Sequence, residues 1–376
     1  MARKVLIARG GALPNSTGLG RAHFNLIERF ENGRIRNYEL LDVVEHKLGG
    51  NPIFKLINRW FKHPRTVSKL IKTKSPDLLL ITDQEQSHLI PKKSKIPSAV
   101  IVHDLFQIFP RIVESRGEKI EVGEKNVNSI RKRDINYLKK GLERADLIIC
   151  ISEATKKEVL QYWPNKSCHV VPHGIETSTL NPNNAAREKP SWLQKEKCNL
   201  IYVGTDDPRK RLEFALQIIG EMPDEIKKDI ILHKIGIETN SSTLEKLGII
   251  ASDSKVAINW VGKLDDEDLF ATYQYGDALI FPSIAEGFGL PPLEAMACGC
   301  PLIMADAPAH NEVSDEKFLL PPDDINAWKK RIETIHSDWS VRNGKERIAN
   351  SDSILRAENF SVERWCSNLE DALSKL

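Results

Sequence analysis

The chain has 376 residues, of which 41% are apolar and 28% charged, a composition typical of a globular protein with a substantial core. It excludes a disordered or collagen-like chain, and no apolar run approaches the roughly 20 residues of a membrane span. The six cysteines form no CxxC pair, so we expect neither a zinc site nor a disulfide framework and predict a reducing, cytoplasmic location.

The net charge of +2 conceals a difference between the two halves of the chain. Residues 1–180 hold 31 Lys and Arg against 19 Asp and Glu, a net +12, and the remainder carries a net −10. A basic first half favours phosphates, an anionic membrane or nucleic acid as partners. No helix-turn-helix, zinc pattern or interleaved aromatic and basic pattern is present, so we expect no nucleic-acid partner.

Short apolar runs alternate with segments of helical periodicity in the first half. The runs lie at residues 4–8, 40–44, 77–82, 98–104, 146–152 and 169–174. Runs that are apolar on both faces are typical of parallel strands covered by helices. One intervening segment, 130–144, places Ile135, Leu138 and Leu142 on one helical face. The alternation predicts a doubly wound α/β domain over residues 1–176.

A polar, proline-bearing stretch at 177–198 reads as a linker, after which the alternation restarts. The second set of runs lies at residues 200–204, 230–236, 256–262, 277–283 and 301–305. These predict a second doubly wound domain over 199–358, and 359–376 reads as a final helix. Neither first strand is followed directly by GxGxxG, which argues against a nicotinamide or flavin cofactor.

The string EGFGLPPLEAMACGCP at 286–301 follows an expected strand. Glu286 falls on the strand–helix loop, a proline suits the helix start, and Glu294 is expected in the first helical turn. Backbone amides at such a turn form a site for anions or sugar hydroxyls. The structural alternative is that Glu294 only favours the helix dipole, worth about 0.3–1 kcal/mol, and that Glu286 is a solvated loop residue.

The whole string resembles the EGFGLP-x-LEAMA-x-G-x-P segment of the retaining glycosyltransferases of family four. These enzymes have the GT-B fold, two Rossmann-like domains facing across a cleft, with the last helix returning to the first domain. The resemblance implies that Glu286 lies beside the donor sugar and that Glu294 binds the ribose hydroxyls. The residues whose amides would contact sugar hydroxyls are Gly287, Phe288, Gly289 and Leu290.

Two further segments of the second half resemble the same family. YVGTDDPRKRLEF at 202–214 is similar to the segment that holds the donor diphosphate, which implies that role for Lys210 and Arg209 beside Gly204. Thr205 stands where many members have an arginine. The segment at 260–283 resembles the base-binding region and implies that Gly262 and Lys263 lie near the nucleobase.

In the first half, SAVIVHDLFQIFP at 98–110 resembles the family's strand ending in His-Asp. This implies that His103 lies beside the donor sugar and the acceptor. The structural alternative is a packed histidine. A glycine-bearing loop at 8–26 is expected to face the donor phosphates. Its candidate donor-binding residues are Gly18, Gly20 and Arg21.

The resemblance implies transfer of a hexosyl group, with mannose favoured, from a nucleotide diphosphate sugar to a hydroxyl, with retention of configuration. Basic side chains would replace a metal, so we expect neither a metal nor a cofactor. The alternatives are a sugar-nucleotide epimerase of the same fold and a catalytically degenerate nucleotide-sugar-binding protein. An epimerase would have no separate acceptor.

Residues 51–76 are basic and amphipathic, with Trp60 and Phe61 among the aromatics. Such a segment can lie on an anionic membrane surface. We therefore predict a peripheral protein at the inner membrane face, whose first domain binds a glycan or lipid-linked acceptor. The alternative is an ordinary surface helix packed on that domain.

Overall fold

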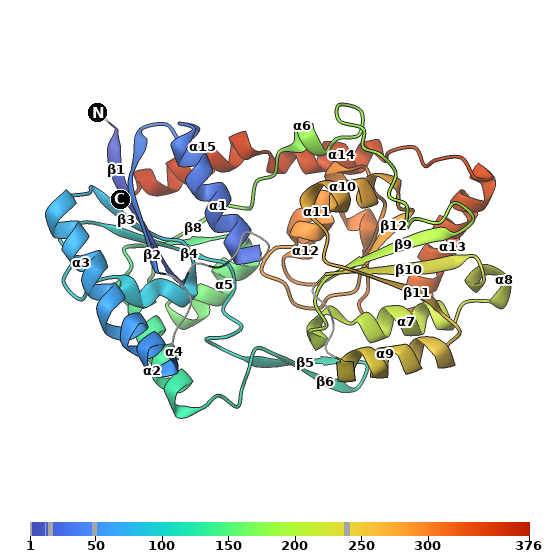
Figure 1. The fold of residues 1–376 in the computed structure, drawn as a ribbon, viewed down its shortest axis with the longest axis horizontal. Helices are drawn as coiled ribbons and strands as arrows, with labels where there is room; N and C mark the ends of the chain where they lie inside the picture. The colour runs from blue at the N-terminus through green and yellow to red at the C-terminus, as the bar shows by residue number, and fades with distance from the viewer. Residues whose placement is uncertain (1, 12, 14–17, 47–50, 237–240) are drawn as a thin grey trace. The chain divides into compact units, whose positions relative to one another are not determined.

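The computed structural model describes residues 2–11, 13, 18–46, 51–236 and 241–376 (Figure 1). The contacts within the chain divide it into two compact units. The N-terminal unit comprises Met1–Arg111, Gly123–Gly174 and Glu363–Leu376. The C-terminal unit comprises Ile112–Val122 and Ile175–Val362.

The N-terminal unit contains a six-stranded sheet in the order β2-β1-β3-β4-β7-β8, with every neighbouring pair parallel. Its strands are β1 (Arg3–Gly11), β2 (Tyr38–His46), β3 (Leu78–Ile81), β4 (Ser98–Val102), β7 (Leu147–Cys150) and β8 (Cys168–Val170). All of β3, β4 and β7 is buried. The prediction of strands covered on both faces is confirmed.

The helices of this unit are α1 (Gly18–Glu31), α2 (Pro52–Ile57), the π-helix η1 (Asn58–Lys62), α3 (His63–Lys74), the 3-10 helix η2 (Gln84–Leu89), α4 (Ser129–Arg144), α5 (Glu153–Tyr162) and α15 (Val362–Ser374). On α4, Leu138 and Leu142 are fully buried and Ile135 packs beside them, so the predicted helical face is confirmed. Asn128 and Ser152 cap α4 and α5 by accepting hydrogen bonds from backbone amides.

The last helix, α15, is an integral part of the N-terminal unit. Trp365, Leu369 and Leu373 are buried on one face at helical spacing. The guanidinium of Arg29 on α1 lies 4.3 Å from the centroid of the Trp365 ring, a cation–π contact. The chain thus completes its first unit with its last residues.

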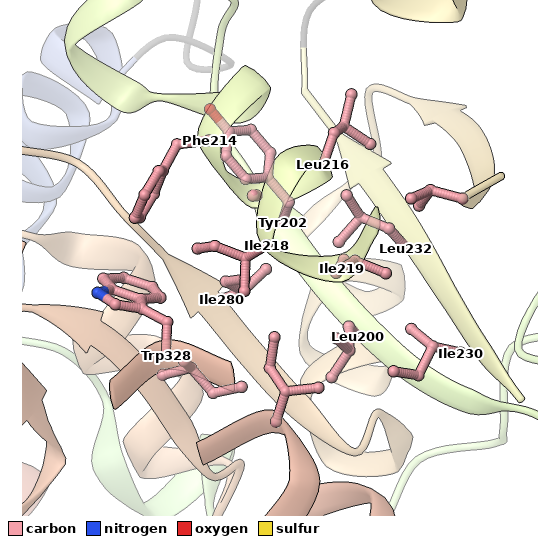
Figure 2. Packing of buried hydrophobic residues seen from close by; sticks show 14 of the residues in the cluster. Leu200, Tyr202, Phe214, Leu216, Ile218, Ile219, Ile230, Leu232, Ile280 and Trp328 are labelled. Carbon is pink, nitrogen blue, oxygen red and sulfur yellow. The ribbon is translucent and has the colours of Figure 1, made fainter. Parts of the chain in front are cut away.

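The C-terminal unit contains a second six-stranded parallel sheet in the order β11-β10-β9-β12-β13-β14. Its strands are β9 (Cys198–Val203), β10 (Ile230–Ile235), β11 (Ala257–Gly262), β12 (Ala278–Phe281), β13 (Leu302–Ala305) and β14 (Leu319–Leu320). Figure 2 shows the core on one face, where Leu200 and Ile280 from the strands pack with Phe214, Ile218 and Trp328 from helices.

The helical elements of this unit are α6 (Thr177–Leu180), the 3-10 helix η3 (Pro208–Lys210), α7 (Leu212–Gly220), α8 (Asp224–Lys227), α9 (Ser241–Asp253), α10 (Asp266–Tyr275), α11 (Leu290–Ala297), α12 (His310–Val313), the 3-10 helix η4 (Glu316–Phe318), α13 (Ile325–Arg342), α14 (Ser351–Ala357) and the 3-10 helix η5 (Glu358–Phe360). In Figure 1, α7 and α9 lie on one side of the sheet and α10 and α11 on the other. The order of strands and the helices on both faces make each unit Rossmann-like.

Residues 177–198, expected as a linker, belong to the C-terminal unit and are anchored on it. Leu180 and Leu193 are buried, and Arg187 forms an ion pair with Glu267 at 2.9 Å. The segment is polar because it runs along the surface of the unit, and its few buried side chains attach it there.

A β-hairpin that the sequence did not predict is made by β5 (Arg111–Ser115) and β6 (Glu118–Val122). Arg116 and Gly117 at its tip both have positive φ, 54° and 76°, which is what a two-residue type I′ turn requires. Although the flanking residues on both sides belong to the N-terminal unit, the hairpin packs with the C-terminal unit, β6 against η3.

Candidate active site

Glu286, Lys210 and Arg209 form an ion cluster beyond the carboxyl ends of β9 and β12. Lys210 Nζ lies 2.8 Å from Glu286 Oε1, and Arg209 Nη1 lies 2.9 Å from Glu286 Oε2. The hydroxyl of Ser283 donates to the same Oε1 at 2.9 Å. The structure therefore brings together three of the predicted site residues, and adds Ser283, which the sequence analysis did not single out.

The charge state of this cluster follows from its surroundings. Burial alone would raise the pKa of Glu286, but the charges of Lys210 and Arg209 outweigh it and hold that pKa at about 2. Glu286 is therefore an anion at any physiological pH, and the cluster carries one net positive charge. The side chains of all three residues are less than one fifth exposed, so solvent screens their charges little.

The two cations are presented by the short helix η3. Asp207 caps this helix by accepting the amide of Arg209 at 3.1 Å, and its carboxylate also pairs with the Arg209 side chain at 3.2 Å. Gly204 lies opposite, where an added Cβ would come within 2.9 Å of Lys210 Cδ. A larger residue at 204 would have to displace the Lys210 side chain, so glycine leaves room for Lys210 at the end of β9.

The helix is also fixed at its far end by Arg211, which has a positive φ of 55°. Arg211 donates to the carbonyl of Pro322 at 2.8 Å and pairs with Asp323 at 3.0 Å. Asp323 in turn accepts the hydroxyl of Ser115, on the β5–β6 hairpin, at 2.6 Å. These contacts compensate for the unfavourable left-handed conformation of a buried arginine.

The predicted strand–helix turn is present at the start of α11, with one correction. Gly289 precedes the helix with φ 117°, a conformation that favours glycine, and Leu290 and Pro291 open the helix. Glu294 therefore lies one residue beyond the first turn, not within it, because the helix begins before the prolines. Its side chain is buried, at 3% exposure.

The other residues expected along this turn differ in exposure. Gly287 and Leu290 are partly exposed, whereas Gly289 and Phe288 are buried. The Phe288 ring meets Phe360 edge-on at 5.7 Å. The side chain of Phe288 therefore packs into the unit, which leaves only its backbone for ligand contact.

His310, which the sequence analysis did not single out, is close to this cluster. It is fully buried, and its Nδ1 lies 2.8 Å from the carbonyl of Ala305, so Nδ1 carries the proton and Nε2 is an acceptor. Burial lowers its pKa, in spite of the nearby charge of Glu286. Its position just past β13, at the carboxyl edge of a parallel sheet, is the signal that could have identified it.

His103 belongs to the N-terminal unit, where it follows β4. It is buried, its Nε2 donates to the carbonyl of Thr82 at 3.1 Å, and its ring stacks on His173 at 5.3 Å. Burial lowers its pKa to about 4, so it is a neutral imidazole with Nδ1 as the acceptor. Asp104 caps the next turn, accepting the amide of Phe106 at 3.1 Å.

The remaining predicted residues lie at or just after the ends of strands, or on a helix. Gly262 ends β11 with φ 78°, and both Lys263 and Thr205 are exposed. Gly18 and Gly20 belong to the first turn of α1, so the prediction that they form a loop is wrong. Residues 12 and 14–17 of that expected loop lie outside the described residues.

Among the described residues, no cluster of three or more His, Cys, Asp or Glu side chains has the spacing of a metal site. An arrangement of two cations around an ionised carboxylate, beside a helix start, is suited to bind a diphosphate and sugar hydroxyls together. Fold and site thus define a two-domain α/β protein with a largely buried ion cluster at the carboxyl edge of its second sheet.

Comparison with known proteins identifies the family. Residues 184–351 match the family described as "Glycosyl transferases group 1", and residues 23–179 match "Glycosyltransferase Family 4". The two matches together take up most of the chain. The chain belongs to the family-four glycosyltransferases of the GT-B type, as the sequence resemblance predicted.

Its relatives include mannosyltransferases at modest identity. The chain is 27% identical over 254 residues to O-antigen chain mannosyltransferase B of Escherichia coli, covering 65% of this chain and 66% of that protein. It is 24% identical over 201 residues to O-antigen chain mannosyltransferase RfbU of Salmonella typhimurium, covering 53% of each. The chain thus spans about half to two thirds of the length of these relatives.

Solved structures agree on the fold. Sucrose-phosphate synthase from Thermosynechococcus elongatus matches with a TM-score of 0.73 at 16% identity, covering 99% of this chain and 98% of that one. Anabaena HepE, solved in complex with UDP and glucose, matches with a TM-score of 0.69 at 17% identity, covering 100% of both chains. At such identities the likeness supports the fold alone.

Proposed function

We propose that this glycosyltransferase moves a hexosyl group, with mannose favoured, from a nucleotide diphosphate sugar to a hydroxyl of a glycan or lipid-linked acceptor. The observation that carries the proposal is the ion cluster of Glu286, Lys210 and Arg209. It supplies cations for the leaving diphosphate and a carboxylate for the sugar within a few ångströms of each other.

The chemical role of the cations follows from where charge develops. When the bond between the sugar and the diphosphate breaks, negative charge accumulates on the leaving diphosphate oxygens. Lys210 and Arg209 are held in place before this happens, by Glu286 and by the cap of η3, so they need no reorganisation during the reaction. They would stabilise the negative charge of the leaving diphosphate, which a metal ion does in other transferases. We therefore propose metal-independent transfer.

The stereochemical course is proposed to be retention. A double displacement requires a nucleophilic carboxylate on the face opposite the leaving group. Glu286 is paired with both cations that would hold the diphosphate, so its carboxylate would lie on the leaving-group side. This favours a front-face reaction, in which the acceptor oxygen bonds to the anomeric carbon on the side from which the diphosphate leaves, and the hydroxyl proton passes to a diphosphate oxygen.

The other donor contacts are proposed from the same turn and strands. Glu294 would accept hydrogen bonds from the ribose hydroxyls. The backbone of 287–290 would contact the sugar, and Gly262 and Lys263 would lie near the base. Mannose is favoured because the named mannosyltransferases are relatives and because PRK occurs at 208–210.

For the acceptor, we propose the N-terminal unit as the binding domain and an anionic membrane surface as its location. The structure contains no helix, among the residues it describes, that is both long and apolar enough to cross a bilayer. The segment 51–76 forms α2, η1 and α3, and Ile53, Phe54 and Phe61 on it are 65%, 63% and 43% exposed. Exposed apolar side chains among lysines fit a membrane surface.

The test combines donor binding with turnover. Purified protein is screened by thermal shift against GDP-mannose, UDP-glucose, UDP-galactose and UDP-GlcNAc, because a donor at 100 times its Kd adds about 2.7 kcal/mol to stability. Nucleoside diphosphate release is then measured with and without a polyprenyl-linked glycan, in EDTA and in magnesium. Release that needs the acceptor and persists in EDTA supports the proposal. Epimerised donor without release would establish the epimerase, and binding without either reaction would establish the degenerate protein.

A further inference from the structure

The N-terminal unit has its own cavity of about 510 Å³ at the carboxyl ends of β1 and β3. Small-molecule sites commonly measure roughly 300–1,000 Å³. Gly11 and Asp83 line it from the strand ends, His23 from α1, and Lys55 and Arg59 from α2 and η1. The cavity belongs to one unit, and none of the ion cluster around Glu286 takes part in it.

The inner wall of this cavity has polar groups that the described residues leave without hydrogen bonds. Asp83 and His23 are 7% and 2% exposed, and neither Asp83 Oδ1 nor either ring nitrogen of His23 has a partner among them. The nearest acid to His23 Nε2 is Glu45 Oε2 at 3.8 Å, beyond hydrogen-bond distance. An unpaired buried polar group costs about 1–3 kcal/mol, so retaining several in one wall points to a ligand.

The cations deep in the cavity are already neutralised. Arg9 Nη2 pairs with Glu45 Oε2 at 2.7 Å, and Arg59 Nε pairs with Asp134 Oδ1 at 2.8 Å. Burial, and secondly the charge of Arg9, lowers the pKa of His23 to about 3, so His23 is neutral. Within the described part of the chain, the inner wall therefore offers no unpaired positive charge to a phosphate.

What the wall offers is a mixed set of donors and acceptors. A carboxyl group accepts hydrogen bonds, and a neutral imidazole both donates one and accepts one. Hydroxyl groups, which donate and accept at once, complement such a set, and several adjacent hydroxyls are the chemistry of a sugar ring. By contrast, Lys55, Lys62 and Phe54 on the same cavity are exposed, so they add two cations and an aromatic ring on its solvent side.

We propose that this cavity is the site for the acceptor's terminal sugar, and that this sugar is a neutral, hydroxyl-rich hexose. Asp83 and His23 bind its hydroxyls, and the anionic or apolar remainder of the acceptor lies across the rim of lysines and Phe54. The role as acceptor site rests on the proposed transferase function, whereas the choice of a neutral sugar rests on the cavity wall.

The experiment is saturation-transfer NMR on the full chain, with the methyl glycosides of mannose, glucose and galactose as probes and inorganic phosphate as competitor. At least one methyl hexoside is expected to bind, and phosphate should not displace it. Asp83→Asn, which keeps the shape of the side chain, and His23→Phe, which removes both ring nitrogens, should each weaken binding about tenfold. The matched control is Glu143→Gln, because Glu143 is an exposed carboxylate on α4 outside the cavity.

Thermal shift with the nucleotide diphosphate that binds the wild type reports whether each variant is folded, since that ligand is expected on the other unit. Equal hexoside affinity in the wild type and both folded variants overturns the proposal, as does displacement by phosphate or the absence of any hexoside binding. If one variant fails to fold, the other decides.

Donor turnover is measured on the same samples. Turnover without hexoside binding refutes this inference alone, and hexoside binding with no sugar nucleotide consumed refutes the transferase function while leaving a sugar site.

Discussion

Lys210 Nζ and Glu286 Oε1 lie 2.8 Å apart, and this ion pair joins residues 76 positions apart in the sequence. It connects the loop after β9 with the loop after β12, two strands that are neighbours in the sheet. The carboxylate also binds Arg209, so removing Glu286 would leave both cations without the partner they share in a largely buried site.

Lys210→Ala is expected to reduce glycosyl transfer by about 10²–10³-fold, because the leaving diphosphate loses a preorganised cation. The measurement is kcat from nucleoside diphosphate release. Lys246→Ala is the control, since Lys246 is an exposed lysine paired with Glu213 on the same unit. Wild-type turnover in Lys210→Ala would rule out the diphosphate role.

Substitutions of the two glutamates are expected to change different kinetic constants. Glu294→Gln should raise the donor KM, because a ribose contact is made equally in the bound donor and in the transition state. Glu286→Gln should lower kcat more than it changes KM, since its carboxylate fixes Lys210 and Arg209 for the reacting diphosphate. Steady-state kinetics in donor concentration distinguishes the two patterns, and identical effects in both variants would contradict the assignment.

The hairpin contact to η3 predicts an effect from outside the ion cluster. Asp323→Ala removes the carboxylate that links Ser115 to Arg211, which adjoins Lys210. Loss of these hydrogen bonds should cost transfer about two- to tenfold in kcat/KM, measured at a temperature at which the melting curve shows the variant to be folded. The control is Asp253→Ala on α9. The neighbouring Asp324 is not used because it caps α13. Equal kcat/KM in Asp323→Ala and the control would show that the hairpin does not position η3.

Asp83 predicts a pH dependence of folding stability. Burial, and secondly the charge of Glu85, raises the pKa of Asp83 from 3.8 to about 7 in the folded protein. Between these values the folded state binds more protons than the unfolded state, so this residue's contribution to stability falls as pH rises. Asp83→Asn should therefore be more stable than the wild type at pH 8, by at most about 4 kcal/mol, and nearly equal to it at pH 4.

Urea unfolding at both pH values measures this difference. Asp253→Asn, an exposed aspartate on α9, serves as the control and should show no such dependence. A gain in Asp83→Asn that is the same at pH 4 and pH 8 would mean that ionisation of Asp83 is not its cause.

Membrane binding is expected to depend on exposed side chains and not on Trp60. Trp60 Nε1 donates to Asp134 Oδ1 at 2.9 Å and its ring packs on Tyr137, so this aromatic is part of the fold. Phe54→Ser with Phe61→Ser should weaken sedimentation with anionic vesicles without lowering the melting temperature. Binding should fall with salt, since each nearby basic residue contributes about 1 kcal/mol at low ionic strength. Equal partition to neutral and anionic vesicles would leave a soluble acceptor as the better interpretation.

The sequence determined the framework of the protein, because its signals are local. Apolar runs such as Leu78–Ile81 could be recognised as buried parallel strands, and EGFGLP as a strand–helix turn, from periodicity and residue type alone. Each of these patterns depends on residues within a few positions of each other. The two sheets were therefore predictable, and the family was predictable from the resemblance of the string at 286–301.

The tertiary structure decided which distant groups meet. Glu286 could be placed on its loop from sequence, but its ion pairs with Lys210 and Arg209 depend on β9 and β12 being adjacent in the sheet. The same holds for His310 and for the hairpin that packs on η3, neither of which the sequence singled out. The cavity between Asp83 and His23 has a similar origin, since they lie on separate elements that only packing brings together. Periodicity reports which face of an element is buried, and the fold alone decides what that face is buried against.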